Sequence, residues 1–326
     1  MKTQCLLATD KNALATASAC LLAGDLVALP TETVYGLAAN ALDPQAIRKI
    51  YLAKGRPQDN PLIVHIPDAS LVEKFAQIPK HFDLAKFSQT FWPGPITILL
   101  QKNGSALDSA CAGLSKVALR VPDSAFFCDL MRLSGLALAA PSANLSGSPS
   151  PTSAWHVKKD LVGKIPLIID GGECRVGLES TVLDLSDPIP RMLRPGGISL
   201  ERLTDYFGEV VCVFDVKEHQ APESPGQKYR HYAPSLPLHI CPPDQITYNC
   251  DTVYLLTEET KNQLQFPENQ VILLGSRDQL AFVASRLFAS LRLADTTNFK
   301  KIVCESLPTA GIGLAIMNRL NRASKG

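Results

Sequence analysis

The chain has 326 residues, enough for two domains, and its 32 basic side chains nearly balance 31 acidic ones. This balance excludes the global basic field that drives non-specific nucleic-acid binding. The nine cysteines form no Cys-x-x-Cys pair, no signal peptide precedes them, and no apolar run reaches transmembrane length. We therefore expect a cytoplasmic protein with reduced thiols and no membrane contact.

The first motif is a polar turn at a strand end. The apolar run 26–29 predicts a buried strand, which Pro30 ends because proline has no N–H donor. The turn Thr31-Glu-Thr-Val-Tyr-Gly36 follows, with two hydroxyls, a carboxylate and a phenol. Ligands bind at strand ends in α/β folds, so this turn is a candidate binding edge. A capped turn, with Thr31 or Thr33 bonding local backbone, is an equally good interpretation.

The second motif places two cations close together. Lys54 and Arg56 are flanked by Gly55 and Pro57, which predicts an irregular, extended segment with both side chains on one face. An arginine fork and a lysine point charge suit phosphate oxygens, whereas a lone Lys-x-Arg is more often a solvated loop. The apolar run 62–64 predicts a strand with His65 at its end, and a lone histidine there is more often structural.

The third motif is a cation inside a strand. The run 117–121 is apolar except for Arg120, and arginine is rarely buried without a partner. We expect a carboxylate or a phosphate beside it. The alternative to a ligand site is a structural salt bridge to Asp or Glu.

The fourth motif is a long loop after a strand of small residues at 136–140. Its hydroxyls, amide and backbone N–H groups predict a neutral cradle for a polyanion, although such loops are often flexible connectors. Thr152 is a candidate N-cap for the helix that follows. The loop contains Ser142, Asn144, Ser146, Ser148, Ser150 and Thr152.

Two further segments end in polar groups. Two strands flank a glycine-rich turn between residues 167 and 185, and Glu179, Ser180 and Thr181 open the second strand. Arg194 lies ahead of a Pro-Gly-Gly turn.

The domain boundary follows from composition. Residues 215–237 are rich in Pro, Gly and polar side chains, which predicts a linker between domains 1–214 and 238–326. Beyond it, strands at 238–241, 252–256, 271–274 and 301–305 alternate with helices at 278–293 and 314–320, which indicates a small parallel α/β domain. The first domain has irregularly interleaved strands and helices, which indicates a twisted mixed sheet. Its predicted helices are 11–23 (capped by Asp10), 44–52, 81–90, 124–134, 152–161 and 199–207.

The order of these motifs resembles the YrdC-like family. The matching segments are Pro30-Thr-Glu-Thr-Val-Tyr-Gly-Leu37, Lys54-x-Arg-Pro-x-x-Asn-Pro-Leu-Ile-Val-His65, Phe91-Trp-Pro-Gly-Pro-Ile-Thr97, Ala140-Pro-Ser-Ala-Asn144, Glu179-Ser-Thr181 and Leu193-Arg-Pro-Gly196. Tyr229-Arg-His-Tyr-Ala-Pro234 resembles the linker of the long form, the threonylcarbamoyl-adenylate synthases. The resemblance implies a sheet curved around a substrate cavity, a Rossmann-like C-terminal domain and a linker that acts as a lid.

The resemblance also implies a reaction. L-threonine, bicarbonate or carbon dioxide, and ATP would give L-threonylcarbamoyl-AMP and pyrophosphate. The product would pass to the machinery that makes N6-threonylcarbamoyladenosine at position 37 of tRNA. Mg²⁺ is expected to enter with ATP, without a dedicated protein cage.

Site residues are implied by the same likeness. L-threonine would contact Thr33, His65, Arg120, Ala140 and Ser180. Lys54 and Arg56 would act on the phosphates as catalytic cations. ATP would contact Arg56, Asn60, Lys116, Ser142, Asn144, Ser150, Arg194 and Tyr232, the last as a cover from the linker.

Two other functions remain open from the sequence. One is a double-stranded RNA-binding module, which the near-neutral charge disfavours, although weak RNA binding is compatible with it. The other is a different carbamoyl-transfer enzyme of the same fold, of the kind found in hydrogenase maturation. That class adds zinc-finger regions, and this chain has no Cys-pair spacing to match.

Overall fold

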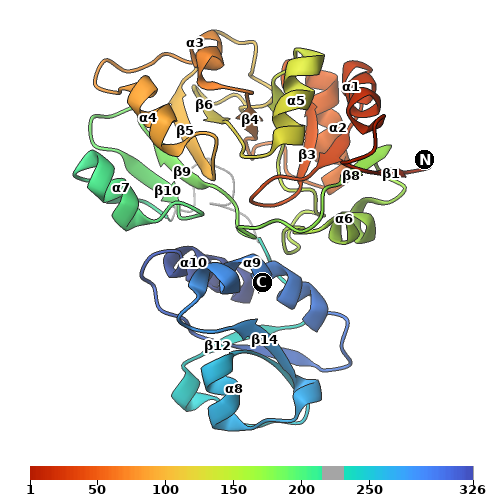
Figure 1. Ribbon diagram of the computed structural model, residues 1–326, viewed down its shortest axis with the longest axis vertical. Coiled ribbons are helices and arrows are strands. Elements are labelled where there is room, and N and C mark those ends of the chain that lie inside the picture. Colours follow the sequence, from red (N-terminus) through yellow and green to blue (C-terminus); the bar gives the residue numbers. More distant parts are fainter. Residues whose placement is uncertain (215–230, 326) are drawn as a thin grey trace.

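Two separate sheets organise the chain (Figure 1). The computed structural model describes residues 1–214 and 231–325, and the arrangement confirms the predicted fold class of a mixed-sheet unit followed by a parallel one. β11 ends at Cys212 and β12 begins at Leu238, so the predicted linker 215–237 lies between the two sheets. Of that linker, residues 215–230, including the motif positions Lys228, Tyr229 and Arg230, lie outside the described residues.

Within the described residues, the first sheet has 11 strands in the order β1-β8-β2-β3-β7-β4-β6-β5-β9-β10-β11, with parallel and antiparallel neighbours. The strands are β1 Gln4–Leu7, β2 Val27–Leu29, β3 Gly36–Asn40, β4 Ile63–His65, β5 Ile96–Gln101, β6 Lys116–Arg120, β7 Leu138–Ala139, β8 Leu167–Asp170, β9 Thr181–Asp184, β10 Arg191–Arg194 and β11 Val211–Cys212.

The register of this sheet brings the distant motifs together. β4 and β6 are parallel, and His65 at the end of one lies opposite Arg120 at the end of the other. The turn between β2 and β3 lies next to the loop that follows β7, because Gly36 forms a bridge with Ser142. Strand-end polar groups separated by up to about a hundred residues therefore converge, as expected where parallel strands share one edge.

The helices of the first unit largely follow the predictions. They are α1 Ala13–Leu22, α2 Pro44–Lys54, α3 Val72–Phe75, α4 Leu84–Phe91, α5 Ala125–Ser134, α6 Ala154–Leu161 and α7 Leu200–Phe207, with a 3₁₀ turn η1 at Ala69–Leu71. Leu26, Leu37, Val64, Ile98 and Phe87 belong to the main apolar core of this unit.

Two predicted N-caps are wrong. The cap of α1 is Asn12, and the Asp10 carboxylate accepts a hydrogen bond from the Asn12 N–H. Asp10 therefore stabilises the turn that precedes α1 and is not the cap of the helix. The cap of α6 is Ser153, whose hydroxyl accepts the N–H of His156. Adjacent hydroxyl residues compete for such a position, and only the backbone φ and ψ decide between them.

The four strands of the second unit match the prediction closely, whereas helix α8 was not predicted and α10 is longer than expected. Its four strands, in the order β12-β15-β13-β14, are all parallel. Its elements are β12 Leu238–Cys241, η2 Pro243–Gln245, β13 Thr252–Thr257, α8 Glu258–Leu264, η3 Glu268–Gln270, β14 Val271–Gly275, α9 Leu280–Ala294, β15 Lys301–Glu305 and α10 Gly313–Ser324. None of the helices in the described ranges has the length and hydropathy needed to cross a membrane.

Helices α9 and α10 lie between the small sheet and the first unit, whereas α8 lies on the far side (Figure 1). The contact is close: Val34 and Leu178 of the first unit share an apolar cluster with Val283 and Phe288 of α9. At Gly177, with φ +72°, an added Cβ would lie 2.4 Å from the Cα of Ser285. Gly177 is therefore needed both for its backbone conformation and for the approach of α9.

The Gly177 approach predicts a difference between two glycine substitutions. Gly177→Ala and Gly172→Ala both place a Cβ at positive φ, which costs about 1–2 kcal/mol, but no atom lies within 4 Å of the added Cβ at Gly172. We expect Gly177→Ala to lose clearly more unfolding free energy than Gly172→Ala, measured by urea denaturation. Equal losses would show that α9 does not press on Gly177.

Candidate functional site

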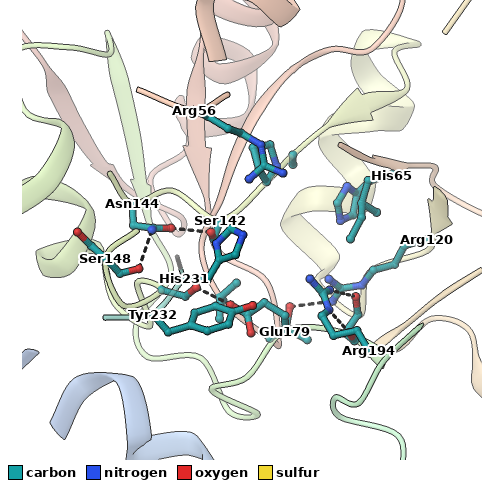
Figure 2. A pocket seen from close by; sticks show the side chains of 17 residues that line it. Arg56, His65, Arg120, Ser142, Asn144, Ser148, Glu179, Arg194, His231 and Tyr232 are labelled. Atoms are coloured by element: carbon teal, nitrogen blue, oxygen red, sulfur yellow. Dashed lines mark hydrogen bonds between the residues drawn. The ribbon is translucent and has the colours of Figure 1, made fainter. Parts of the chain in front are cut away.

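The strand ends and loops of the first unit enclose one cavity, which is partly covered by His231 and Tyr232 (Figure 2). The space between the side chains is about 60 Å³. Typical ligand sites have about 300–1,000 Å³, so this one as it stands has room for only a few water molecules. The lining residues are Thr33, Val34, Arg56, Ile63, His65, Arg120, Ala140, Pro141, Ser142, Asn144, Ser148, Ser150, Glu179, Ser180, Arg194, His231 and Tyr232.

One side of the cavity is formed around Arg120 (Figure 2). The Arg120 Nη2 lies 2.7 Å from Glu32 Oε1 and donates to Thr33 Oγ1 at 3.0 Å, while its Nε donates to the carbonyl of Gly94. The structure therefore contains the salt bridge that was the alternative to a ligand site, with Glu32 of the polar turn as the partner. Nη1 makes no hydrogen bond within the described residues, so part of the guanidinium fork faces the cavity.

His65 lies beside Arg120 as an uncharged ring. It is 2% exposed, packs against the ring of Phe127, and its Nδ1 has no hydrogen-bond partner among the described residues. Burial, followed by the nearby charge of Arg120, lowers the pKa of His65 to about 3. At neutral pH this ring therefore offers neutral nitrogens and no charge.

Ser180 and Arg194 close the same side. The Ser180 hydroxyl lies 2.7 Å from that of Thr97, and Arg194 Nη2 donates to it at 3.1 Å. Arg194 Nε also donates to the Ser180 carbonyl. Burial lowers the pKa of Arg194, yet the group stays a cation at neutral pH.

Arg56 forms the opposite side of the cavity (Figure 2). Its Nη2 and Nε donate to the carbonyls of Pro61 and Asn60, and no carboxylate of the described residues pairs with it. Burial lowers the pKa of Arg56 to about 10, so it remains charged at pH 7. A buried guanidinium held only by carbonyls lacks an anionic partner, which a ligand can supply.

The serine-rich loop is ordered by its own hydrogen bonds. The Ser142 hydroxyl donates to Asn144 Oδ1 at 2.5 Å, and Asn144 Nδ2 donates to the carbonyl of Ser148 at 2.9 Å. The Lys54 ammonium donates to the carbonyls of Ser142 and Asn144 at 2.5 and 2.6 Å. Lys54 thus stabilises the loop without lining the cavity.

The prediction of an extended Lys54–Arg56 segment is wrong. Lys54 is the last residue of α2, and Gly55, at φ +61°, turns the chain so that only Arg56 enters the cavity wall. Burial lowers the pKa of Lys54 well below its usual value. The helix continues through Lys54 because no proline or polar cap intervenes before Gly55.

Two other predicted contacts do not lie at the cavity. Lys116 begins β6, four residues and therefore about 13 Å from Arg120, and its ammonium pairs with Asp184 at 2.7 Å. Asn60 is buried, its carbonyl accepts a hydrogen bond from Arg56 Nε, and its Oδ1 has no partner among the described residues. The other predicted site residues, Thr33, Arg56, His65, Arg120, Ala140, Ser142, Asn144, Ser150, Ser180, Arg194 and Tyr232, all line the cavity.

Two titratable lining residues, Glu179 and His231, were not among the predicted ligand contacts. Glu179 stands beside Ser180 in the same motif, and His231 precedes Tyr232, so adjacency is the signal that could have found them. Burial, followed by nearby arginine charges, lowers the pKa of His231 to about 3. Tyr232 is 5% exposed, at φ +66°, and stacks on Phe288 of α9.

The charges around the cavity are of both signs but unequal. Four guanidinium groups, on Arg56, Arg120, Arg194 and Arg319, stand against the carboxylates of Glu32 and Glu179. The described residues contain no cluster of three His, Cys, Asp or Glu that could hold a metal ion. The arrangement favours an anionic ligand bound by arginines, hydroxyls and backbone.

Comparisons with known proteins identify relatives over both units. The Sua5, YciO and YrdC family model, described as telomere recombination, matches residues 19–196, and a model described as the C-terminal domain of threonylcarbamoyl-AMP synthase matches residues 198–325. The threonylcarbamoyl-AMP synthase of Bacillus subtilis is 45% identical over 98% of this chain and 95% of its own length. That of Schizosaccharomyces pombe is 39% identical over 91% and 84%.

A solved structure matches the whole fold as well. Pyrococcus abyssi Sua5 complexed with L-threonine has a TM-score of 0.88 and 41% identity, over 96% of this chain and 94% of its own.

The neutral state of His65 predicts a pH effect on stability. The unfolded histidine titrates near 6.5 and the folded one near 3, so the unfolded state binds more protons between these values. Stability therefore falls as the pH drops through this window, by about 1.4 kcal/mol per pH unit for this residue. His65→Asn should reduce that slope in urea unfolding between pH 4 and 6, with the exposed His239→Asn as control. An unaltered slope in His65→Asn would contradict the assignment.

Proposed function

The chain belongs to the threonylcarbamoyl-AMP synthase family in its two-domain form, and we propose that its cavity joins L-threonine, carbon dioxide or bicarbonate, and ATP. The family is one of nucleotidyltransferase enzymes. The products are L-threonylcarbamoyl-AMP and pyrophosphate, and the adenylate then serves N6-threonylcarbamoyladenosine formation in tRNA. The observation that supports this assignment is a cavity with buried arginines on two opposite sides, Arg120 on one and Arg56 on the other.

The Arg120 side is the proposed threonine site. The relative from P. abyssi has been solved with L-threonine, and the Nη1 of Arg120, which makes no hydrogen bond to any described residue, suits an α-carboxylate. Thr33 and Ser180 supply hydroxyls for the polar groups of the amino acid. The neutral ring of His65 can accept a hydrogen bond from a donor such as the threonine hydroxyl. The backbone of Ala140 borders the same side.

The Arg56 side is the proposed nucleotide site. Arg56 would face the phosphates, with the hydroxyl and amide groups of Ser142, Asn144 and Ser150 around them, and Arg194 would contact them from the Arg120 side of the cavity. Mg²⁺ would enter as part of the MgATP substrate, held by phosphate oxygens and water rather than by a protein cage. Since the cavity is too small for a nucleotide as it stands, His231 and Tyr232 must move for ATP to enter.

The chemistry requires one displacement at phosphorus. The threonine amine takes up carbon dioxide and loses a proton to give a carbamate. A carbamate oxygen then attacks the α-phosphorus of ATP, and the bond to the β-phosphate oxygen breaks as pyrophosphate leaves. The protein acts by holding both reactants in line and by stabilising phosphate charge, so a nucleophilic side chain is unnecessary. Lys54 contributes by fixing the loop rather than by touching the reactants.

The experiment that tests this function is pyrophosphate release from ATP in bicarbonate buffer. We expect release to depend on L-threonine and to be much lower with serine or valine. Salt-sensitive RNA binding without turnover would favour an RNA-binding module instead. Pyrophosphate release that needs no threonine would favour a different carbamoyl transfer. Cytoplasmic location, where tRNA is available, belongs to the same proposal.

Replacement of Arg120 should affect mainly threonine. Arg120→Lys keeps a cation beside Glu32 but removes the fork, so we expect the KM for threonine to rise about tenfold or more. The KM for ATP should change little. The exposed Arg132→Lys is the matched control. Equal increases in both KM values would contradict the carboxylate assignment.

Replacement of Arg56 should separate activity from stability. Arg56→Met removes a buried cation that has no carboxylate partner among the described residues, so unfolding free energy should be unchanged or higher by about 1 kcal/mol. The KM for ATP should rise at least about tenfold because a phosphate contact is lost. A variant with normal ATP kinetics would remove Arg56 from the nucleotide site.

A further inference from the structure

The second unit contributes a buried side chain that contacts two lining residues of the cavity, Glu179 and Tyr232. Arg319, on α10, is 0% exposed and is the largest fully buried side chain of the described residues. Its Nε donates to Glu179 Oε2 at 2.8 Å, and its Nη2 donates to the carbonyl of Pro195 at 2.9 Å. Both partners belong to the first unit, so α10 reaches across the contact between the units.

Arg319 also contacts Tyr232, one of the two residues that partly cover the cavity. Its guanidinium carbon lies 5.3 Å from the centre of the Tyr232 ring, within the range of a cation–π interaction. Pro195 directly follows Arg194, one of the lining cations. One buried guanidinium therefore joins three parts of the wall: the Glu179 strand end, the Arg194 turn and the tyrosine that covers the site.

Glu179 is the unusual member of this wall. It is the one carboxylate among the residues that line the cavity as the structure describes it, and its Oε1 accepts the Ser150 hydroxyl. Burial tends to raise the pKa of Glu179, but the charges of Arg319 and Arg194 and the Ser150 hydrogen bond outweigh it and lower that pKa. Glu179 is thus an anion at neutral pH, in a place where a triphosphate would have to bind.

An unneutralised carboxylate beside phosphates is strongly unfavourable in a buried site, because like charges interact through a low dielectric. Arg319 supplies the counter-charge from the second unit. The carboxylate can then orient Ser150 without repelling the nucleotide.

We propose that Arg319 is a positioning residue for nucleotide binding, and that by neutralising Glu179 it makes the second unit part of the ATP site. This inference rests on the proposed function for the identity of the nucleotide. The second unit would then take part in nucleotide binding, which a spacer or a docking platform would not do.

A second interdomain arginine serves as the structural comparison. Arg292, on α9, is 7% exposed and donates to the Pro149 carbonyl and to the Asp160 carboxylate. It is buried in the same contact, although less completely than Arg319, and its partner Asp160 does not line the cavity. Loss of Arg292 should loosen the units without leaving an unpaired charge beside the phosphates.

The test uses the full chain and four variants: Arg319→Met, Arg319→Lys, Glu179→Gln and the double variant Arg319→Met with Glu179→Gln. The comparison variants are Arg292→Met with and without Asp160→Asn. The readouts are the KM values for ATP and threonine and the Kd of a non-hydrolysable ATP analogue, measured by calorimetry. We expect Arg319→Met to weaken analogue binding and raise the ATP KM at least about tenfold, with a far smaller change for threonine. Arg319→Lys, which keeps the charge, should stay within about threefold of the unsubstituted chain.

The double variant decides between a charge effect and a structural one. If Arg319 acts as the counter-charge, adding Glu179→Gln restores analogue binding to within about threefold of Glu179→Gln alone. The proposal is overturned if Glu179→Gln gives no rescue, if Arg319→Lys is as defective as Arg319→Met, or if Arg292→Met with Asp160→Asn shows the same rescue. Should Arg319→Met not fold, Arg319→Gln with and without Glu179→Gln replaces it.

Failure of the proposed function is recognised separately. An unsubstituted chain that binds the ATP analogue but releases no pyrophosphate with threonine would refute the function and leave the counter-charge test intact. An unsubstituted chain that does not bind the analogue would refute both.

Discussion

The candidate site depends on how the protein stabilises three arginine side chains that are buried away from water. Arg56, Arg120 and Arg194 are 9%, 4% and 7% exposed and surround one cavity, and a buried charge is unfavourable unless it is paired or bound to dipoles. Arg120 is paired with Glu32, Arg194 is bound to Ser180, and Arg56 has only backbone carbonyls among the described residues. The two glutamates near the cavity reduce the positive potential without cancelling it, so the site still favours an anionic ligand.

The architecture explains why the two walls face each other. Parallel pairing of β4 and β6 sets His65 and Arg120 side by side, while the end of α2 presents Arg56 and the loop held by Lys54 supplies hydroxyls and amides. Helices α9 and α10 of the second unit pack against the first unit beside the cavity, and Gly177 permits the close approach of α9. Contacts that stabilise the interface, such as Arg319 with Glu179, are therefore also contacts of the site.

Much of this could be predicted from the sequence. Apolar runs ending in polar turns predicted the strand ends, and the alternation beyond residue 238 predicted the parallel unit with nearly correct bounds. The motifs at Thr33, Arg56, His65, Arg120, Ser142 and Arg194 all reached the cavity. Lys54, Asn60 and Lys116 did not. Residue spacing alone cannot tell whether a helix continues two residues further, or which end of a strand faces the site. The contact of Arg319 with Glu179 joins residues 140 positions apart, and no local pattern indicates such a pair.

The central claim is that one cavity holds an amino acid at Arg120 and a polyphosphate at Arg56. The most direct measurement is a crystal structure of this chain with L-threonine and an ATP analogue that cannot be cleaved between the α- and β-phosphates. We expect the threonine carboxylate within hydrogen-bonding distance of Arg120, the phosphates beside Arg56 and Arg194, and the amine directed toward the α-phosphorus. Both ligands bound outside this cavity, or bound with Arg120 and Arg56 contacting neither, would contradict the claim.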